Sequence, residues 1–376
     1  MRRELTAHQA SLVLNALPNI GPVTLNRLLV EMGGDPRQVL AAPGNRLGSV
    51  RGVGPVIRST LERWEEHFDL KREEERMGKA GVSFITPTDP GYPPLLKEIH
   101  DPPIGLYRRG RYDFSDRCIA IVGSRRTSLY GQATARRLGG ELARLGFCIV
   151  SGLARGIDTA AHEGALEAGG RTAAVLGTGI DLIYPPENLQ LYRRIEQDGA
   201  IISEFPFGRR ADKQSFAMRN RIVAGCSEAV IVVESDVRGG AMITARFAGE
   251  QGRLLFAVPG RIDQPTSAGC HQLIRDGATL LTGVEDLLAE LNYLGGNRPS
   301  PIPSAGGDES APPVAGNLTE GEQRIRAAFS GGAILHADDI VTQTGLDAAT
   351  VSAGLLILEL KRLIAKRTDG AFEAIA

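Results

Sequence analysis

The sequence predicts an α/β protein in which a doubly wound parallel sheet is flanked by an N-terminal helical domain and a C-terminal winged helix. Three patterns predict this organisation. Short apolar runs alternate with helix-length segments in the middle of the chain, a G-P-V segment occurs twice near the N-terminus, and a helix-turn-helix pattern precedes a hairpin pattern at the C-terminus. Alternating strands and helices are typical of a parallel sheet with helices on both faces.

The N-terminal domain, residues 1–110, contains the repeated G-P-V segment. "NIGPVTLNRLL" begins at Asn19 and "GVGPVIRSTLE" begins at Gly52, and each continues with the apolar period of a helix. The pair is typical of two helix-hairpin-helix elements, in which a glycine lets backbone N–H groups approach a phosphate at a helix N-terminus. The alternative is that Gly-Pro simply starts each helix, because proline suits the first helical position. The residues alone leave both interpretations open.

The central domain, residues 111–293, is expected to form the sheet. Its runs are apolar on both faces and end in glycine or small polar residues, which is typical of buried parallel strands. In chain order they are "CIAIVGS", "FCIVSG", "TAAVLG", "AIISEF", "AVIVVES", "LLFAVPG" and "ATLLTG". Ligands of such sheets bind at the carboxyl ends of the strands. The candidate binding residues of this chain fall at those ends.

The C-terminal part of the chain reads as a tether followed by a small domain. Residues 294–317 are rich in proline, glycine and serine, which predicts a flexible tether. Residues 318–376 are expected to form the winged helix. Thr319 and Glu322 have the spacing of a capping box, and the chain alternates across the Asp-Gly pair at 369–370, a strong hairpin signal.

The expected recognition helix of this winged helix, Asp347 to Leu360, is unusual for a DNA reader. It presents alanine, threonine and serine, and no basic residue occurs before Lys361. A surface for a partner protein or for a second copy of the chain is therefore as consistent with this helix as a DNA contact.

Composition excludes a global attraction to polyanions. The chain has 43 lysines and arginines against 44 acidic residues, so any nucleic-acid site must be a local patch. No apolar stretch approaches the roughly 18 residues of a membrane span, and the N-terminus lacks the unbroken apolar region of a signal peptide. We therefore expect a cytoplasmic protein with no membrane partner. The four cysteines have no C-x-x-C spacing and are expected to be reduced and buried.

The first candidate binding residues lie in glycine turns at the ends of the predicted strands. Such turns expose backbone N–H groups, and neighbouring arginines supply charged donors for phosphates. The candidates are Gly123, Ser124, Arg125 and Arg126 after the first run, Ser151, Gly152, Arg155 and Gly156 after the second, and Gly239 and Gly240 after the fifth. The alternative for Arg125 and Arg126 is a role in surface ion pairs. The chain has neither G-x-G-x-x-G nor G-x-x-x-x-G-K-[ST], so a dinucleotide or ATP site is disfavoured and no cofactor is expected.

The second group of candidates lies in the densest basic segment, residues 205–225, "FPFGRRADKQSFAMRNRIVAG". The candidates are Lys213, Phe216, Arg219, Asn220 and Arg221. Bases stack on aromatic rings while cations follow phosphates, which grips a single strand without reading its sequence. On a helix, Arg219 and Arg221 point about 200° apart, so one is expected to face the pocket while the other packs or pairs. The alternative is a solvated charged face.

No catalytic group or metal site is predicted. His162 has no serine, acid or cysteine partner at a useful spacing, so we interpret it as a packed helix residue. Cys270 and His271 are adjacent, but no second ligand pair is spaced for zinc. Paired catalytic carboxylates are also not evident. The residues therefore favour a binding protein over an enzyme.

Seven ordered motifs resemble the DNA-processing protein A family, also called DprA or Smf. They are "GSRRTSLYG", "SGLARGIDTAAHEGAL", "AVLGTGIDLIYPPEN", "SEFPFG", "RNRIVAG", "GGAMITA" and "FAVPG". The resemblance implies an extended Rossmann-like domain that binds single-stranded DNA, forms homodimers and loads the RecA recombinase onto incoming DNA in natural transformation. It also implies an N-terminal sterile-alpha-motif-like (SAM-like) domain, and in some members a C-terminal winged helix.

The same resemblance assigns six residues to the DNA pocket. They are Arg125, Lys213, Phe216, Arg219, Asn220 and Arg221. Ala217 departs from the family pattern, which often has proline there, and this puts the placement of the neighbouring aromatic ring in question. All six residues were also selected by the physical reasoning above.

One enzyme class shares the predicted sheet: nucleotide phosphoribohydrolases like the cytokinin-activating "lonely guy" proteins. Those enzymes carry a P-G-G-x-G-T-x-x-E element that supplies the catalytic acid. Here the corresponding place reads "RGGAMITARFAGE", which lacks both the glycine-threonine order and the matching glutamate. We therefore expect a non-enzymatic DNA-binding protein, with the phosphoribohydrolase as the alternative.

Overall fold

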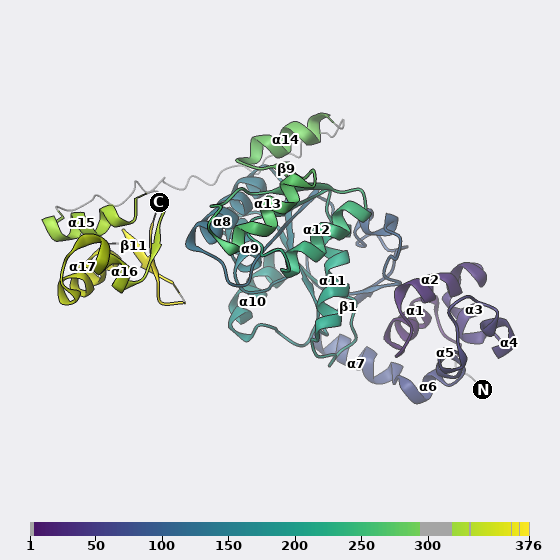
Figure 1. The fold of residues 1–376 in the computed structure, drawn as a ribbon. Helices are drawn as coiled ribbons and strands as arrows, with labels where there is room; N and C mark the ends of the chain where they lie inside the picture. The colour runs from purple at the N-terminus through teal and green to yellow at the C-terminus, as the bar shows by residue number, and fades with distance from the viewer. Residues whose placement is uncertain (1–3, 294–317, 331, 362, 368, 376) are drawn as a thin grey trace. The chain divides into compact units, whose positions relative to one another are not determined.

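The computed structural model describes residues 4–293 and 318–375, except 331, 362 and 368. The chain divides into two compact units, and each is described by itself. The first holds the N-terminal helices and the large sheet, and the second holds the C-terminal helices with a small sheet (Figure 1). The predicted tether, 294–317, lies outside the described residues.

A nine-stranded sheet forms the centre of the first unit. Its strands are β1 (Ser83–Ile85), β2 (Leu106–Gly110), β3 (Cys118–Val122), β4 (Cys148–Ser151), β5 (Thr172–Leu176), β6 (Ala200–Ser203), β7 (Ala229–Val232), β8 (Leu254–Ala257) and β9 (Thr279–Leu280). They are ordered β1-β2-β6-β5-β4-β3-β7-β8-β9, and the seven strands from β3 to β9 are mutually parallel. The predicted doubly wound parallel sheet is confirmed, and each predicted run contains one of these strands.

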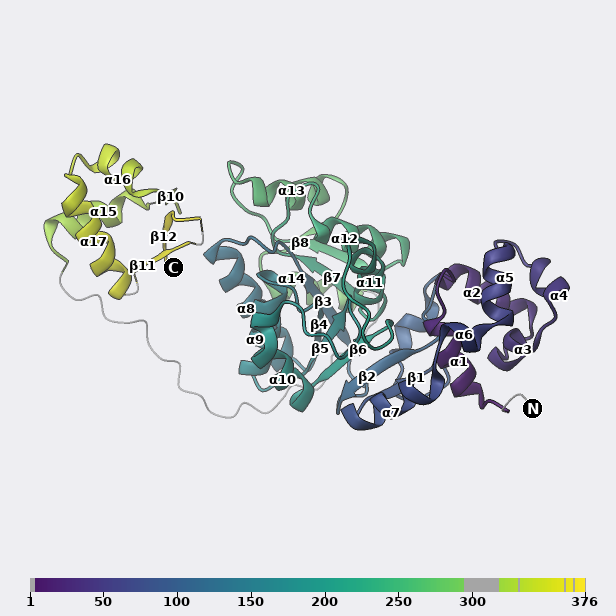
Figure 2. The same cartoon turned by 90° about the horizontal axis from the view of Figure 1, so that it is seen from below.

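Helices cover both faces of the parallel strands. They are α8 (Leu129–Arg144), α9 (Ile157–Glu167), α10 (Leu189–Asp198), α11 (Lys213–Gly225), α12 (Gly240–Glu250), α13 (Ala268–Arg275) and α14 (Val284–Tyr293). Figure 2 shows the strands between α8, α9 and α10 on one side and α11 and α12 on the other. Alternate residues of one strand enter different cores, since Ile149 packs with α8 and α9 whereas Val150 packs with α11 and α12. This two-sided burial explains why the strands read as unbroken apolar runs.

The strand order places a topological switch point between β3 and β7. From β3 the chain proceeds outward through β4, β5 and β6, and it then returns to add β7, β8 and β9 on the other side of β3. The loops after β3 and β7 therefore leave in opposite directions and open a crevice between them. This crevice is where the two groups of candidate residues meet.

The N-terminal segment is helical, as predicted. Its helices are α1 (Ala7–Ala16), α2 (Pro22–Glu31), α3 (Pro36–Ala41), α4 (Gly44–Gly48), α5 (Pro55–Glu62), α6 (Trp64–His67) and α7 (Leu70–Ala80). Each G-P-V segment starts a helix, with proline as the first helical residue of α2 and of α5. The left-handed backbone of each turn lies two residues before the glycine of its G-P-V segment, at Asn19 (φ 64°) and Gly52 (φ 96°). The predicted phosphate contact of these turns stays a prediction.

Two strands from the segment assigned to the helical domain join the large sheet. β1 and β2 pair with each other and β2 pairs with β6, all antiparallel. Tyr107 of β2 donates a 2.8 Å hydrogen bond to Glu73 of α7, and its ring packs edge-on against Phe84 at 5.3 Å. The N-terminal helices and this edge of the sheet consequently share one hydrophobic core. A domain boundary at residue 110 remains a prediction.

Within the described residues, three short 3₁₀ helices lie in the connections, at Pro94–Glu98, Pro186–Asn188 and Pro265–Ser267. The four cysteines are free and buried, as predicted. Burial raises the pKa of the Cys148 and Cys226 thiols well above the ordinary value, which keeps them protonated.

The second unit has the elements of a winged helix. They are α15 (Glu320–Ala328), β10 (Ile334–Leu335), α16 (Ala337–Thr344), α17 (Ala348–Leu360), β11 (Ile364–Lys366) and β12 (Phe372–Ala374). The predicted capping box forms, since Thr319 Oγ1 accepts from Glu322 N at 3.3 Å and Glu322 Oε2 accepts from Thr319 N at 3.1 Å. β11 and β12 pair antiparallel as the predicted hairpin, and Gly370 has the left-handed backbone of its turn (φ 87°).

Over the described ranges, no helix taken singly has the length and apolar character needed to cross a membrane. One bent pair, Ala337–Thr344 with Ala348–Glu359, meets that requirement only when its two helices are taken together.

Candidate nucleic-acid interface

A cavity of about 550 Å³ opens at the carboxyl ends of β3, β4 and β7, at the switch point of the sheet. Its size is within the range of small-ligand pockets. Eleven of the fifteen predicted binding residues line it: Gly123, Ser124, Arg125, Arg126, Gly152, Lys213, Phe216, Arg219, Asn220, Gly239 and Gly240. Ser151, Arg155, Gly156 and Arg221 do not. The structure therefore brings most of both candidate groups to one place.

The loop after β3 presents Arg125 and Arg126 at the cavity. A side chain at Gly123 would collide with Ile157 and with the Glu234 carbonyl oxygen, at 2.5 and 2.9 Å, so only glycine fits. Ser124 N donates to that same carbonyl at 2.7 Å, and its hydroxyl donates to the Arg126 carbonyl oxygen at 2.8 Å. Ser124 was predicted to bind phosphate, but its N–H and hydroxyl are engaged inside the protein. Its role is to shape the loop that carries the two arginines.

Helix α11 brings Lys213, Phe216 and Asn220 to the cavity. A capping box starts the helix, because Asp212 accepts from Ser215 N at 2.7 Å while Ser215 Oγ accepts from Asp212 N at 3.0 Å. Residues three and four apart share one face of a helix. The three side chains therefore follow each other along the wall of the cavity.

The Phe216 ring is half-buried and surrounded by cations and an aromatic. Gly177 lies directly against it, since a side chain there would come 2.8 Å from Phe216 Cδ1. The guanidinium carbons of Arg125 and Arg219 lie 4.8 and 5.9 Å from the ring centroid. The ring centroid of Tyr184 lies 5.7 Å from that of Phe216. Such contacts pre-orient a ring without withdrawing it from solvent.

Arg219 forms the floor of the cavity and is 3% exposed. Its Nη1 donates to the Val175 carbonyl oxygen at 2.5 Å, and its Nε has no hydrogen-bond partner among the described residues. Burial lowers the pKa of Arg219 to about 10, and the nearby Arg125 adds to this effect. Gly152 makes room for it, because any side chain at Gly152 would overlap the guanidinium. A buried cation with so few acceptors favours an anionic ligand.

Asp158 is the acid nearest to Arg219 in the cavity wall. Its carboxylate accepts from Gly152 N at 3.1 Å and from Ala154 N at 3.3 Å, which fixes the turn before α9. Burial raises the pKa of Asp158, and the charge of Arg219 opposes that shift. The sequence does not reveal that this acid also lines the cavity, because its spacing from the basic segment is long.

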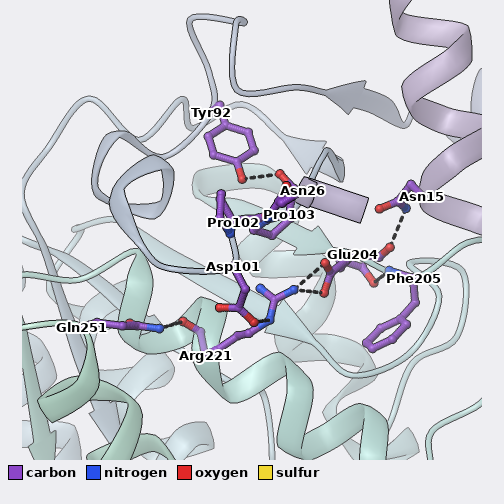
Figure 3. Close-up of polar contacts among 11 residues, drawn as sticks. Asn15, Asn26, Tyr92, Asp101, Pro102, Pro103, Glu204, Phe205, Arg221 and Gln251 are labelled. Atoms are coloured by element: carbon purple, nitrogen blue, oxygen red, sulfur yellow. Dashed lines mark hydrogen bonds and ion pairs between the residues drawn. The ribbon is translucent and has the colours of Figure 1, made fainter. Parts of the chain in front are cut away.

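Arg221 corrects one of the predictions. It is 2% exposed and turned away from the cavity, as the helical geometry requires when Arg219 faces it. Its Nη2 donates to both oxygens of Glu204 at 2.5 and 2.7 Å, and its Nε lies 3.2 Å from Asp101 Oδ2 (Figure 3). Arg221 is therefore part of a buried ion-pair cluster and does not line the cavity.

Three further predicted residues lie outside the cavity. Ser151 is fully buried and donates to the Ile121 carbonyl oxygen at 2.6 Å, so it cannot reach a ligand. Gly156 caps α9 with a left-handed backbone (φ 79°), and a side chain there would collide with the Ser124 carbonyl oxygen. Arg155 is half-exposed and ion-paired with Glu187. Ser151 and Gly156 support the loops around the cavity and do not line it.

No catalytic arrangement involves His162. Its side chain is fully buried and its Nδ1 lies 2.6 Å from Thr172 Oγ1, which agrees with the predicted packing role. Burial lowers the pKa of His162 to about 3, so the ring is neutral. Within the described part of the chain, no cluster of three or more histidine, cysteine or acidic side chains is arranged to hold a metal ion.

Comparisons with known proteins agree with this geometry. Residues 83–292 match the model of the DNA recombination-mediator protein A family, and residues 309–370 match the DprA winged helix domain. Protein Smf of Synechocystis sp. is 35% identical over 387 residues, which cover 94% of this chain and 96% of that protein. DNA processing protein DprA of Streptococcus pneumoniae is 44% identical over 62% of this chain and 82% of its own length.

Two solved structures are also similar. The X-ray structure of DprA from Streptococcus pneumoniae matches with a TM-score of 0.66 and 35% identity, covering 76% of this chain and 98% of that one. A structure of DNA processing protein A from Helicobacter pylori, described with a single-stranded DNA binding mode, matches with a TM-score of 0.51 and 32% identity, covering 56% and 96%. On its sequence, its sheet topology and its C-terminal winged helix, this chain belongs to the DprA/Smf family of DNA-processing proteins.

Proposed function

We propose that the cavity at the switch point binds single-stranded DNA through phosphate contacts and base stacking, without reading sequence. One observation carries the proposal. Four cations, Arg125, Arg126, Lys213 and Arg219, line one cavity around the half-buried Phe216 ring, and none of them forms an ion pair with an acid of the described residues. Cations without ion-pair partners around an aromatic ring match the requirements of an unpaired polynucleotide.

The position of Phe216 explains why a single strand fits better than a duplex. Phe216 stands inside the cavity wall, and a base must leave its stack to reach the ring. A duplex keeps its bases stacked and paired, so it offers only phosphates. The single-stranded DNA binding described for the Helicobacter pylori protein supports the same assignment here.

Family membership extends the proposal beyond the site. We infer that the chain acts in the cytoplasm as a homodimer, protects incoming single-stranded DNA during natural transformation, and loads the RecA recombinase onto it. Helix α17 of the winged helix has no basic residue, so its exposed face suits a contact with a partner protein or with a second copy of the chain as well as a contact with DNA. Size-exclusion chromatography with light scattering, and RecA loading assays with and without the protein, test these statements.

The enzyme alternative is disfavoured by the acids of the cavity. Asp158 accepts from two backbone N–H groups, and Asp236 Oδ1 accepts from Arg238 N at 2.9 Å, so both acids shape loops. The sequence also lacks the glutamate of the phosphoribohydrolase element. Release of a free base from a nucleoside monophosphate by the purified protein would reverse this assignment.

The binding proposal is tested by fluorescence anisotropy with single-stranded and duplex oligonucleotides of one sequence. Four engaged phosphates predict a slope of log affinity against log salt near −3, at about −0.7 for each contact with a single strand. Arg125→Ala should reduce the magnitude of that slope by about 0.7 and weaken all sequences equally. An affinity that does not change with salt, or equal binding of duplex and single strand, contradicts the proposal.

A further inference from the structure

We propose that Tyr184 is a second stacking platform for the bound strand, and that Arg155 beside it holds a phosphate beyond the cavity. The inference rests on the proposed function and extends its site. Neither residue lines the cavity itself. Together they lengthen the site along the surface from Phe216 toward the N-terminal turn of α9.

Four side chains form a continuous row, with a cation at each end and two aromatic rings between them. Arg125 lies 4.8 Å from the Phe216 ring centroid, and Phe216 lies 5.7 Å from the Tyr184 centroid with the ring planes tilted by 48°. The Arg155 guanidinium carbon lies 5.9 Å from the Tyr184 centroid. The two rings can each stack on one base, while the cations at the two ends contact phosphates on either side of those bases.

Tyr184 is accessible, unlike the tyrosines of the core. It is 41% exposed, whereas Tyr92, Tyr107 and Tyr192 are each at most 2% exposed. Its exposed ring surface is therefore available to a stacking base beside the cationic cavity. A base covers such a ring and at the same time places its phosphate near Arg155.

The loop that carries Tyr184 is anchored at both ends. Thr178 Oγ1 donates to the Leu182 carbonyl oxygen at 2.8 Å, before the tyrosine. After it, the buried Asn188 donates to the Leu153 carbonyl oxygen at 3.0 Å and to Thr159 Oγ1 at 2.9 Å. Asn188 thereby ties the tyrosine loop to the β4–α9 loop that carries Arg155. A platform held in place loses little conformational entropy when a base stacks on it.

Arg155 is available to a phosphate although it is ion-paired. Its partner is Glu187, and the side chains are 48% and 49% exposed. Pairs this exposed contribute little stability, because water and salt screen both charges. A phosphate can therefore replace the carboxylate at small cost.

The spacing of the two rings adds selectivity for unpaired DNA. Bases stacked in a duplex strand rise by about 3.4 Å, which is less than the separation of these rings. Neighbouring bases can each rest on one ring only after they separate, and a single strand permits this.

The test measures binding of the full chain to a labelled oligothymidylate of about 16 nucleotides, a length at the upper end of known site sizes. Tyr184→Ala should weaken binding by about 5- to 100-fold, the loss expected for one stacked base. Tyr184→Phe is the matched control, because it keeps the ring and should bind within about twofold of wild type, a small fraction of the stacking contribution. Phe216→Ala, measured in parallel, reports on the cavity itself.

The salt dependence of binding tests the proposed phosphate contact of Arg155. Arg155→Ala should reduce the magnitude of the salt slope by about 0.7. Glu187→Gln removes the competing carboxylate and should bind the strand more tightly than wild type, with a larger gain at low salt. An unchanged slope for Arg155→Ala, or weaker binding by Glu187→Gln, overturns the assignment of Arg155.

The outcomes separate this inference from the proposed function. If Tyr184→Ala binds as wild type while Phe216→Ala is weakened, Tyr184 is not a platform and the cavity site stands. Equal weakening by Tyr184→Phe and Tyr184→Ala overturns stacking, because the hydroxyl would then be the contact. If neither Tyr184→Ala nor Phe216→Ala changes the affinity, the proposed function itself fails.

Discussion

Replacing Arg221 by methionine should destabilise the first unit by about 3 to 5 kcal/mol, the cost of removing one partner of a buried ion pair. The substitution removes two charge-assisted hydrogen bonds to Glu204, at 2.5 and 2.7 Å, and one contact to Asp101 at 3.2 Å. The Glu204 side chain is only 10% exposed, so its carboxylate would stay buried without a counter-charge. Asp101 is 22% exposed and can turn toward water, so most of the cost comes from Glu204.

The cluster also joins separate parts of the unit. Glu204 follows β6, Arg221 lies on α11, and Asp101 lies between the short helix Pro94–Glu98 and β2. Asn15 of α1 donates to the Glu204 carbonyl oxygen at 2.7 Å (Figure 3). Loss of Arg221 should therefore loosen the N-terminal helices together with α11.

Urea unfolding followed by tryptophan fluorescence measures this effect. Trp64 on α6 is the single tryptophan of the chain, so its signal reports on the first unit alone. Arg246→Met is the matched control, because the Arg246–Glu250 pair is 65% and 57% exposed and should contribute less than about 1 kcal/mol. Adding Glu204→Gln to Arg221→Met should recover part of the loss, since the stranded charge is then removed.

The same measurements test whether Arg221 is structural and does not contact DNA. A free energy of unfolding within about 0.5 kcal/mol of wild type, as at an ordinary surface site, would refute the reasoning. So would a decrease of the salt slope of DNA binding in the folded Arg221→Met protein, since that would make Arg221 a phosphate contact.

Three further predictions follow from the site and its support. Phe216→Ala should weaken single-strand binding by about 1 to 3 kcal/mol in anisotropy titrations, whereas Phe216→Tyr, which keeps the ring, should stay near wild type; equal losses would argue against stacking. Gly152→Ala should cost about 1 to 3 kcal/mol in urea unfolding because its methyl overlaps Arg219, and this cost should shrink when Arg219→Ala is added; an unchanged cost would place the strain elsewhere. The pKa of His162 is lowered to about 3 in the folded protein, from 6.5 in the unfolded chain, so the ring must lose its proton when the protein folds. The contribution of the neutral ring to the free energy of unfolding is therefore complete above pH 6.5 and is lost as the pH falls toward 3. Between pH 3 and 6.5, the free energy of unfolding should therefore rise with pH, and His162→Gln should reduce this dependence by up to about 1.4 kcal/mol per pH unit in urea unfolding. An unchanged pH dependence would contradict the buried neutral ring.

Local patterns predicted the parallel sheet and much of the site. A strand buried on both faces must be apolar at every position, so β3, β4, β5 and β7 are visible in the sequence as unbroken runs. Parallel strands bring their carboxyl ends to one edge, which is why Arg125 and Gly239 were expected together although they are far apart in the chain. The α11 segment was also visible in the sequence, since basic residues around a phenylalanine match the phosphate contacts and base stacking of a single strand.

Other features depend on partners that are distant in the sequence. β1 and β2 are short, and their membership in the sheet comes from antiparallel pairing with β6, which no local pattern encodes. In the sequence, Ser151 and Ser124 have the pattern of phosphate-binding residues in a glycine turn. Only the folded loops show that their hydroxyls donate hydrogen bonds to backbone carbonyl oxygens. Tyr184 lies within the motif "AVLGTGIDLIYPPEN", but the sequence does not single it out, because an exposed aromatic becomes informative only when its neighbours are known.

Arg219 and Arg221 show the division most clearly. The amino-acid sequence alone determined that two arginines on one helix point in opposite directions, because the helical repeat is a property of the backbone. Only the tertiary structure decided which of them faces the cavity, since that depends on Glu204 and Asp101 neutralising one guanidinium while Gly152 leaves space for the other. Charge and volume supplied by distant segments select between two orientations that are locally equivalent.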